Sequence, residues 1–288
     1  MGVFDILRFI VQHPIGGKHP LRNVGDFARW QLASRLSPGP IIMDWIGGTR
    51  IAVERGMAGI TGSLYVGLHE PSEMGFALHL LRPGDLLLDV GANVGSYTLL
   101  GGGVAGATVH AFEPVALTYE RLVRNVRLND LEGRVTCHPL VVGAAPGTVR
   151  MQTHRDAMNR VMTDGESASS STEVAMTTLD QHLPNASPTL IKIDVEGFEL
   201  SVLQGARDTL SRAAAVLIEV SQNRDEVLAA LLSAGLTPVT YDAMTRTLVA
   251  HTEARFTPGG NAIFVRDVDW ARERCRTAPR TLIKGVSV

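Results

Sequence analysis

The feature that most constrains the fold is an apolar run that ends in an acid and opens at once onto glycines, at residues 86–95. The run from Leu86 to Val90 is long enough for one buried strand, and the glycines that follow allow backbone N–H groups to approach a ligand. A second apolar run, 108–112, ends in Glu113. A strand, a tight glycine turn, a helix and a second strand ending in an acid form half of a nucleotide-binding α/β sheet.

The glycine turn favours a cofactor without phosphates. Its spacing is Gly-Ala-Asn-Val-Gly, so Asn93 stands where a dinucleotide fingerprint has the glycine that lets a pyrophosphate approach the backbone. Asp89 at the strand end repels phosphate but accepts hydrogen bonds from an amino group. Glu113 follows Asp89 at close to the spacing of about 20 residues at which an acid holds ribose hydroxyls. We therefore expect an adenosine-containing cofactor and disfavour a nicotinamide oxidoreductase.

Apolar and amphipathic segments alternate along the middle of the chain. Strands are expected at 85–90, 108–112, 134–138, 190–194 and 215–220, and helices at 96–103, 115–128, 199–210 and 224–234. This alternation predicts right-handed βαβ units and a parallel sheet covered on both faces. Two further strands, 238–241 and 261–265, are expected to return as a hairpin-like pair. A small pair at 148–152 and 173–177 flanks a polar stretch, 164–171, that predicts a mobile loop.

The chain of 288 residues divides into three parts. These are an N-terminal extension at 1–75, a cofactor-binding catalytic domain at 76–268 and a C-terminal tail at 269–288. The extension is expected to be a substrate lid or a dimer contact, because an apolar helix near residues 2–11 favours docking on its own domain or on a second subunit. Association of this helix with a membrane surface is disfavoured, because its polar face lacks the basic residues that usually help such binding.

Composition excludes several classes of protein. The net charge is −2 without a basic block, so no nucleic-acid partner is expected. No uninterrupted apolar run reaches the roughly 18 residues of a membrane span. Two cysteines, Cys137 and Cys275, make no disulfide framework in a chain of this length, which favours a reducing, cytoplasmic location.

Acids follow several of the expected strands. Asp194 and Glu196 come after the apolar strand at 190–193, and Glu219 ends the next one. Because the carboxyl ends of parallel strands face one crevice, these acids are expected beside Asp89 and Glu113. Crowded carboxylates raise one another's pKa, which suits a general base, and they can also hold a divalent cation such as Mg²⁺. We favour the metal-free base, with Asp194, Glu196 and His69 as candidates.

Three motifs together resemble the FkbM family of S-adenosylmethionine-dependent methyltransferases. They are residues 89–95, residues 112–114 and the Lys-x-Asp-x-Glu-Gly block at 192–197, which is characteristic of that family. The resemblance covers about residues 65 to 265. It implies a class I methyltransferase fold of the α/β class: a Rossmann-like, seven-stranded, mostly parallel sheet with one antiparallel strand and helices on both faces. It also implies, most often, O-methylation of sugars, polyketides or other natural products.

The resemblance also implies roles for individual residues. Asp89, Gly91, Asn93 and Gly95 would line the methionine and ribose part of the cofactor, with Ser96 directly after them. Glu113 would hold the ribose hydroxyls and Asp194 would lie at the methionine end. Tyr65, Gly67 and Glu70 match a segment that closes over the cofactor in relatives. Residues 139–143 lack the acid found there in many relatives, so backbone groups are expected to bind the adenine.

Other residues have less specific assignments. Asn129 either joins the cofactor pocket or caps the preceding helix. His154 and His182 flank the polar stretch and are candidates for substrate contact, while Trp30, Trp45 and Tyr65 are candidates for stacking on a sugar.

The leading hypothesis is an O-methyltransferase that converts S-adenosylmethionine to S-adenosylhomocysteine and acts on a small-molecule or glycan hydroxyl. An N- or carboxyl-methyltransferase on the same scaffold is the alternative, and a non-catalytic cofactor-binding protein is a third hypothesis. A homodimer through the extension is also a hypothesis.

Overall fold

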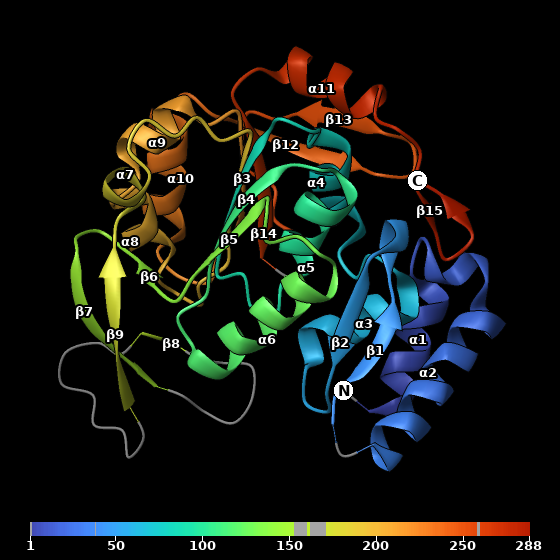
Figure 1. The fold of residues 1–288 in the computed structure, drawn as a ribbon. Coiled ribbons are helices and arrows are strands. Elements are labelled where there is room, and N and C mark those ends of the chain that lie inside the picture. Colours follow the sequence, from blue (N-terminus) through green and yellow to red (C-terminus); the bar gives the residue numbers. More distant parts are fainter. Residues whose placement is uncertain (1, 38, 153–159, 162–170, 258–259) are drawn as a thin grey trace.

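A central eight-stranded sheet organises the computed structural model, which describes residues 2–37, 39–152, 160–161, 171–257 and 260–288 (Figure 1). The strand order is β13-β12-β14-β11-β10-β3-β4-β5. The five parallel strands are β3 (Leu86–Val90), β4 (Thr108–Phe112), β5 (Val135–His138), β10 (Leu190–Ile193) and β11 (Ala215–Glu219). The other three are β14 (Asn261–Val265), which is antiparallel to β11 and β12, β12 (Thr237–Asp242) and β13 (Thr247–Ala250).

The order confirms the expected sheet of seven mostly parallel strands with one antiparallel strand, β14. An eighth strand, β13, pairs with β12 at the edge and has no counterpart among the predicted strands. Pairing places Lys192 of β10 beside Asp89 of β3, and Val90 of β3 beside Phe112 of β4. The parallel strands therefore end together, at one edge of the sheet.

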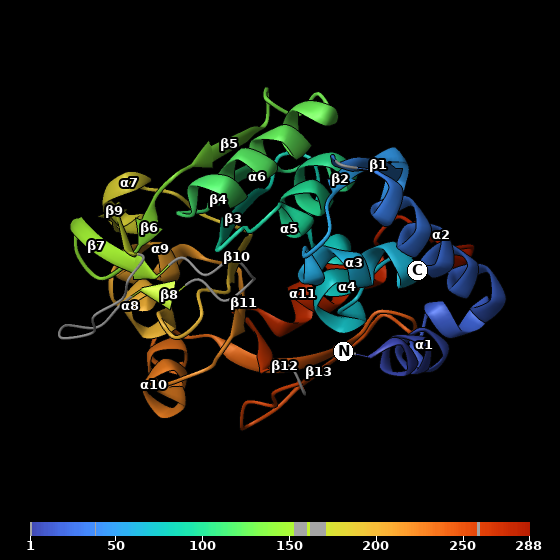
Figure 2. The same cartoon turned by 90° about the horizontal axis from the view of Figure 1, so that it is seen from below.

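Helices cover both faces of this sheet, as Figure 2 shows from below. Leu87 and Leu88 of β3 belong to different apolar clusters, so both faces of the strand are buried and its residues read as one continuous apolar run. One face carries α4 (Pro71–Leu80), α5 (Ser96–Leu99), the π-helical turn η3 (Leu100–Val104), α6 (Ala116–Leu128) and α11 (Val268–Arg276). The other carries α7 (Leu179–His182), α8 (Glu199–Gln204), α9 (Arg207–Arg212) and α10 (Arg224–Ser233).

The N-terminal extension packs beside α5 and α6 (Figure 1). It comprises α1 (Val3–Gln12), η1 (Gly16–Lys18), α2 (Pro20–Leu36), β1 (Ile41–Asp44), η2 (Ile46–Gly48), β2 (Arg50–Val53) and α3 (Ala58–Val66). Ile51 and Val53 of β2 lie in the same buried apolar cluster as Leu87 of the central sheet. The extension and the sheet domain therefore share one hydrophobic core. Among the residues that the structure describes, no helix combines the length and apolar character needed to cross a membrane.

Besides the antiparallel pair of β1 and β2 in the extension, two smaller sheets lie outside the central one in the described residues. One has the order β6-β9-β7-β8, from β6 (Val141–Val142), β9 (Ser171–Thr177), β7 (Gly147–Gln152) and β8 (Arg160–Val161), and it contains the pair expected at 148–152 and 173–177. The predicted mobile loop falls outside the described residues except for Ser171, and His154 falls outside them too. The other sheet is a hairpin of β15 (Leu282–Ile283) and β16 (Val286–Ser287), which is tied to α2 by an ion pair of 2.8 Å between Lys284 and Asp26.

Candidate active site

A cavity of about 950 Å³ opens at the carboxyl ends of the parallel strands. This volume is near the upper end of the range for ligand pockets, which suits a site that holds two molecules at once. The predicted residues that line it are His69, Glu70, Gly91, Asn93, Ser96, Glu113, Asp194 and Glu196. The structure thus brings most of the predicted site into one cavity.

The glycine turn after β3 lies against the segment that follows β10. Gly91 has a φ of +79°, and a Cβ built there would lie 1.8 Å from the carbonyl oxygen of Asp194. Gly95 has a φ of +99° and begins α5, so it shapes the turn without lining the cavity. At position 91, only glycine allows both the positive φ and the close approach of the turn to the backbone of Asp194.

Glu113, at the end of β4, is held by backbone groups of the turn. Its two carboxylate oxygens accept hydrogen bonds from the N–H of Asn93 at 3.0 Å and of Val115 at 2.9 Å. Burial raises the pKa of Glu113 to about 7, although both backbone N–H groups act to lower it. Each oxygen of a carboxylate has room for a further donor, so the fixed side chain can accept bonds from a ligand in the cavity.

Asp89 lies beneath the cavity and does not line it. It is fully buried, and the hydroxyl of Thr98 donates to one of its oxygens at 2.6 Å. Its other oxygen has no hydrogen-bond partner among the described residues. Burial raises the pKa of Asp89, and the nearby Lys192 opposes this shift. This placement therefore does not support a direct contact between Asp89 and a cofactor in the cavity.

Two other predicted cofactor residues lie away from the cavity. Tyr65 is buried in the core, with its ring edge-on to Phe27 at a centroid distance of 5.3 Å. Asn129 is the C-cap of α6, and its side chain exchanges two hydrogen bonds of 2.7 Å with the backbone of Arg50. Tyr65 belongs to the hydrophobic core, because its ring packs against Phe27 of α2. Asn129 caps the helix, which is the second of the two roles considered for it. Neither prediction for the cofactor pocket is supported.

The remaining aromatic and histidine candidates also lie elsewhere. Trp30 is buried, and the indole of Trp45 donates to the carbonyl oxygen of Gly67 at 3.2 Å. His182 lies 3.0 Å from His138 in a histidine ladder that does not line the cavity. These side chains are occupied by structural contacts and form no surface on which a sugar could stack.

Lys192 is the principal residue of the cavity that the sequence analysis left without a role. Its ammonium group donates to Asp194 at 2.7 Å and lies 5.0 Å from the centre of the Tyr97 ring. Burial alone would lower the pKa of Lys192, but Asp194 and Asp89 raise it, so the group stays charged. The sequence did contain a sign of this role, because Lys192 stands within an apolar strand. A lysine that faces the interior needs a carboxylate partner.

Glu70 and His69, from the segment between α3 and α4, form a further part of the cavity wall. Glu70 accepts hydrogen bonds from the hydroxyl of Tyr97 at 2.8 Å and from the amide of Asn261 at 3.1 Å. Nδ1 of His69 lies 2.7 Å from the hydroxyl of Ser63, while its Nε2 lies 3.7 Å from Glu70. Burial lowers the pKa of His69, although Glu70 acts to raise it. The imidazole is therefore neutral near pH 7 and can accept a proton.

The acids at this end of the cavity outnumber its cations. Burial raises the pKa of Glu219 to about 8, and the charge of Asp194 adds to this shift. Burial and Asp194 also raise the pKa of Glu196. Within the described ranges, no group of three or more His, Cys, Asp or Glu residues is arranged to hold a metal ion. The magnesium alternative therefore has no support from this geometry.

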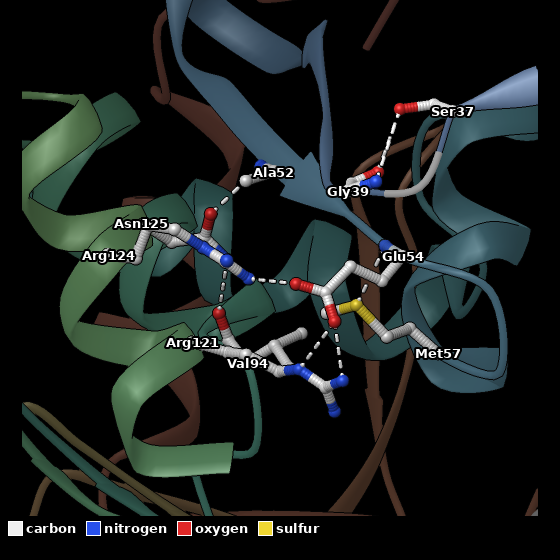
Figure 3. Close-up of polar contacts among 9 residues, drawn as sticks. All are labelled: Ser37, Gly39, Ala52, Glu54, Met57, Val94, Arg121, Arg124 and Asn125. Atoms are coloured by element: carbon white, nitrogen blue, oxygen red, sulfur yellow. Dashed lines mark hydrogen bonds and ion pairs between the residues drawn. The ribbon is translucent and has the colours of Figure 1, made fainter. Parts of the chain in front are cut away.

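The extension is fastened to the glycine turn by polar contacts with α6 (Figure 3). Glu54 accepts hydrogen bonds from the guanidinium groups of Arg121, at 2.5 Å, and Arg124, at 2.7 Å. Burial alone would raise the pKa of Glu54, but these two arginines hold it below its usual value. The buried amide of Asn125 accepts from the N–H of Ala52 and donates to the carbonyl of Val94, both at 2.9 Å.

Replacing Asn125 by alanine is expected to lower the free energy of unfolding by about 2–4 kcal/mol, because two buried backbone groups lose their partner. Urea unfolding measures this loss. Asn129→Ala is the matched control, since its hydrogen bonds to Arg50 lie at a partly exposed position where water replaces them. We expect the control to lose less than about 1 kcal/mol. Equal losses in the two variants would contradict the special role of Asn125.

Comparison with known proteins identifies the family. The family model described as "Methyltransferase FkbM domain" matches residues 89–254, which is more than half of the chain. Hexuronic acid methyltransferase AglP of Haloferax volcanii is 29% identical over 153 residues, covering 49% of this chain and 58% of the relative. The 31-O-demethyl-FK506 methyltransferase FkbM of Streptomyces tacrolimicus is 40% identical over 78 residues, covering 27% of this chain and 29% of that protein.

The chain thus spans less than two thirds of the length of either relative. Among solved structures, methyltransferase FkbM from Methylobacillus flagellatus KT is similar with a TM-score of 0.44 and 16% identity, over 85% of this chain and 60% of that one. The family match includes the glycine turn, Glu113 and the Lys192–Gly197 motif. The chain therefore belongs to the FkbM family of methyltransferases.

Proposed function

We propose that the protein binds S-adenosylmethionine and transfers its methyl group to a hydroxyl of a sugar, polyketide or other natural product. The observation that carries this proposal is the close contact between the turn at Gly91 and the segment after β10, with Glu113 held beside it. Gly91 lets the turn lie against the backbone of Asp194 at the edge of the cavity, Glu113 offers acceptors for ribose hydroxyls, and the apolar residues 139–142 line the side expected for adenine. These features fit the cofactor.

Bound S-adenosylmethionine supplies an activated methyl group on a positively charged sulfur. The protein has to hold the acceptor oxygen in line with it and remove a proton. Alignment of this kind is worth roughly 7–11 kcal/mol, and a positioned base adds about 10²–10⁴-fold. Among the three predicted bases, Asp194 is engaged by Lys192 and Glu196 is exposed, whereas His69 is neutral and partly buried in the cavity wall. We assign the proton transfer to His69.

The charge of the cavity favours a neutral acceptor over a carboxylate. Glu70, Asp194 and Glu196 line it, together with Glu219, which is mostly protonated near pH 7 because its pKa is raised to about 8, and Lys192 is already paired with Asp194. Arg121 also lines it but is bound to Glu54. A carboxylate acceptor would therefore be repelled, as in any cleft lined by one sign of charge. One relative is named for a hexuronic acid and the other for an O-demethyl compound, and the second name fits this cavity better. An amine acceptor is compatible with the same charges.

Titration of S-adenosylhomocysteine by calorimetry tests the proposal, with and without magnesium and a chelator. We expect tight binding that magnesium does not change. Glu113→Gln is expected to weaken binding by about 10–100-fold, because hydrogen bonds to a charged group are worth about 1.5–3 kcal/mol. Glu173→Gln is the control, since Glu173 lines the cavity from β9 but is largely exposed. Absence of binding to the unaltered protein would refute the proposed function.

A panel of neutral sugars, amines and sugar acids then identifies the acceptor class. Methyl transfer to a hydroxyl supports the proposal. Transfer to amines or carboxylates alone would establish the alternative chemistry, and binding of the cofactor without turnover of any acceptor would favour a non-catalytic protein.

A further inference from the structure

Helix α2 carries apolar residues on the face opposite to the one it buries. Its buried residues are Asn23, Phe27, Trp30 and Ser34. At 3.6 residues per turn, the opposite face is a stripe about 80° wide and about 22 Å long. This α2 stripe consists of Leu21, Gly25, Ala28, Leu32 and Leu36. The three leucines are 89%, 62% and 75% exposed, and a Cβ at Gly25 would meet no atom within 4 Å. A helix of a globular protein ordinarily has polar residues here.

Arginines border the α2 stripe on both sides. By the helical period, Arg22 and Arg29 lie along one edge and Arg35 along the other. The Arg29 side chain is 85% exposed, and its ion pair with Asp26 has a separation of 3.7 Å. Asp26 itself is bound more closely by Lys284, at 2.8 Å. The border of the stripe is therefore cationic.

Apolar exposure and positive charge are both concentrated in this part of the chain. Seven of the twelve exposed large apolar side chains of the described residues lie within residues 3–42. Residues 2–37 contain five arginines and lysines but only two acids, whereas the whole chain has a net charge of −2. Helix α2 lies at the periphery of the molecule in both views (Figure 1 and Figure 2). The extension therefore presents a surface unlike the rest of the protein.

We propose that the α2 stripe docks on a membrane surface rich in anionic phospholipid. Leucines of an amphipathic helix enter the boundary between headgroups and acyl chains, while flanking arginines bind phosphates. A second copy of the chain is a poorer occupant, because antiparallel pairing of two stripes about a two-fold axis brings the Arg22 end of one helix against the Arg35 end of the other. Residues 2–11 contain one basic residue, Arg8, whereas the arginines that border the α2 stripe lie on the next helix.

Sedimentation of the full chain with lipid vesicles tests the proposal. We expect binding to phosphatidylcholine vesicles that contain phosphatidylglycerol, little binding to phosphatidylcholine alone, and weaker binding as salt is raised. The combined change Leu21→Ser, Leu32→Ser and Leu36→Ser, and the combined change Arg22→Gln, Arg29→Gln and Arg35→Gln, should each lower the partition coefficient at least about tenfold.

The matched control changes three exposed apolar residues outside the extension: Leu232→Ser, Val249→Ser and Leu282→Ser. It should bind vesicles as the unaltered protein does. Thermal melting and S-adenosylhomocysteine binding check that all variants are folded. The proposal is overturned if the unaltered protein ignores anionic vesicles, if it binds neutral vesicles equally well, or if light scattering shows a dimer that depends on the three leucines while vesicles are not bound.

Discussion

Replacing Gly91 by alanine is expected to weaken S-adenosylhomocysteine binding by roughly a hundredfold or more and to lower the free energy of unfolding by about 2–4 kcal/mol. The new Cβ would lie 1.8 Å from the carbonyl oxygen of Asp194 and 2.8 Å from its carbonyl carbon. Both contacts are with backbone, so no side-chain rotation relieves them. Either the turn after β3 or the segment after β10 has to move, and both line the cavity proposed to hold the cofactor. Calorimetry and urea unfolding measure the two effects.

Gly84→Ala separates the clash from the backbone strain. Gly84 has a φ of +90°, close to that of Gly91, but a Cβ there would meet no atom within 4 Å. This control is expected to lose only about 1 kcal/mol of stability, from the unfavourable conformation, and to bind S-adenosylhomocysteine normally. If Gly91→Ala bound the ligand as well as Gly84→Ala does, the turn would not be the cofactor site.

Replacing His69 by glutamine is expected to reduce kcat by about 10²–10⁴-fold while leaving S-adenosylhomocysteine affinity unchanged. Glutamine keeps the polar contact with Ser63 but cannot accept a proton near neutral pH. Because burial lowers the pKa of His69, the kcat of the unaltered enzyme at saturating cofactor should fall as the pH drops below about 6.5, where the imidazole becomes protonated. The His69→Gln variant should lack this acidic limb. Rate measurements across pH with the acceptor found in the panel show both effects.

Two further variants make the assignment of the base decisive. His182→Gln changes a histidine outside the cavity wall and should leave kcat within about twofold. Asp194→Asn breaks the ion pair with Lys192, so it tests whether that acid is the base instead. Full turnover by His69→Gln together with inactivity of Asp194→Asn would exclude His69 and move the proton transfer to the acid.

The parallel strands and the glycine turn could be predicted because their signals are local. Continuous apolar runs identified β3, β4, β10 and β11, and the turn residues follow β3 directly. The expected helix at 199–210 is instead two helices, because Gly205 packs against the carbonyl of Gly143, where a Cβ would lie 2.0 Å from the oxygen. Gly205 is itself a residue type that often ends a helix, but the segment against which it packs lies far away in the chain.

Predicted residues that follow a strand lie in the cavity, whereas contacts between distant segments could not be predicted from the sequence. Gly91, Glu113 and Asp194 line the cavity as expected from the ends of their strands. The amide of Asn261 donates a hydrogen bond to Glu70, although the two residues are 191 positions apart in the sequence. No sequence spacing predicts such a contact. Tyr65 is buried against Phe27, and an aromatic residue beside a loop looks the same in sequence whether it is buried or stacks on a ligand.

The hydrogen bonds of Asn125 and Glu54, which join the extension to α6, affect how substrate preference could be exchanged between homologous enzymes. The extension supplies Met57 and Ile60 to the cavity wall. It is hydrogen-bonded to α6, and α6 is hydrogen-bonded to Val94 in the glycine turn. If only the extension were transferred from another enzyme, the residues of its cavity wall would come without the α6 side chains that hold them in position. Chimeras should therefore transfer residues 41–66 together with α6, and their boundaries should not fall at residue 75.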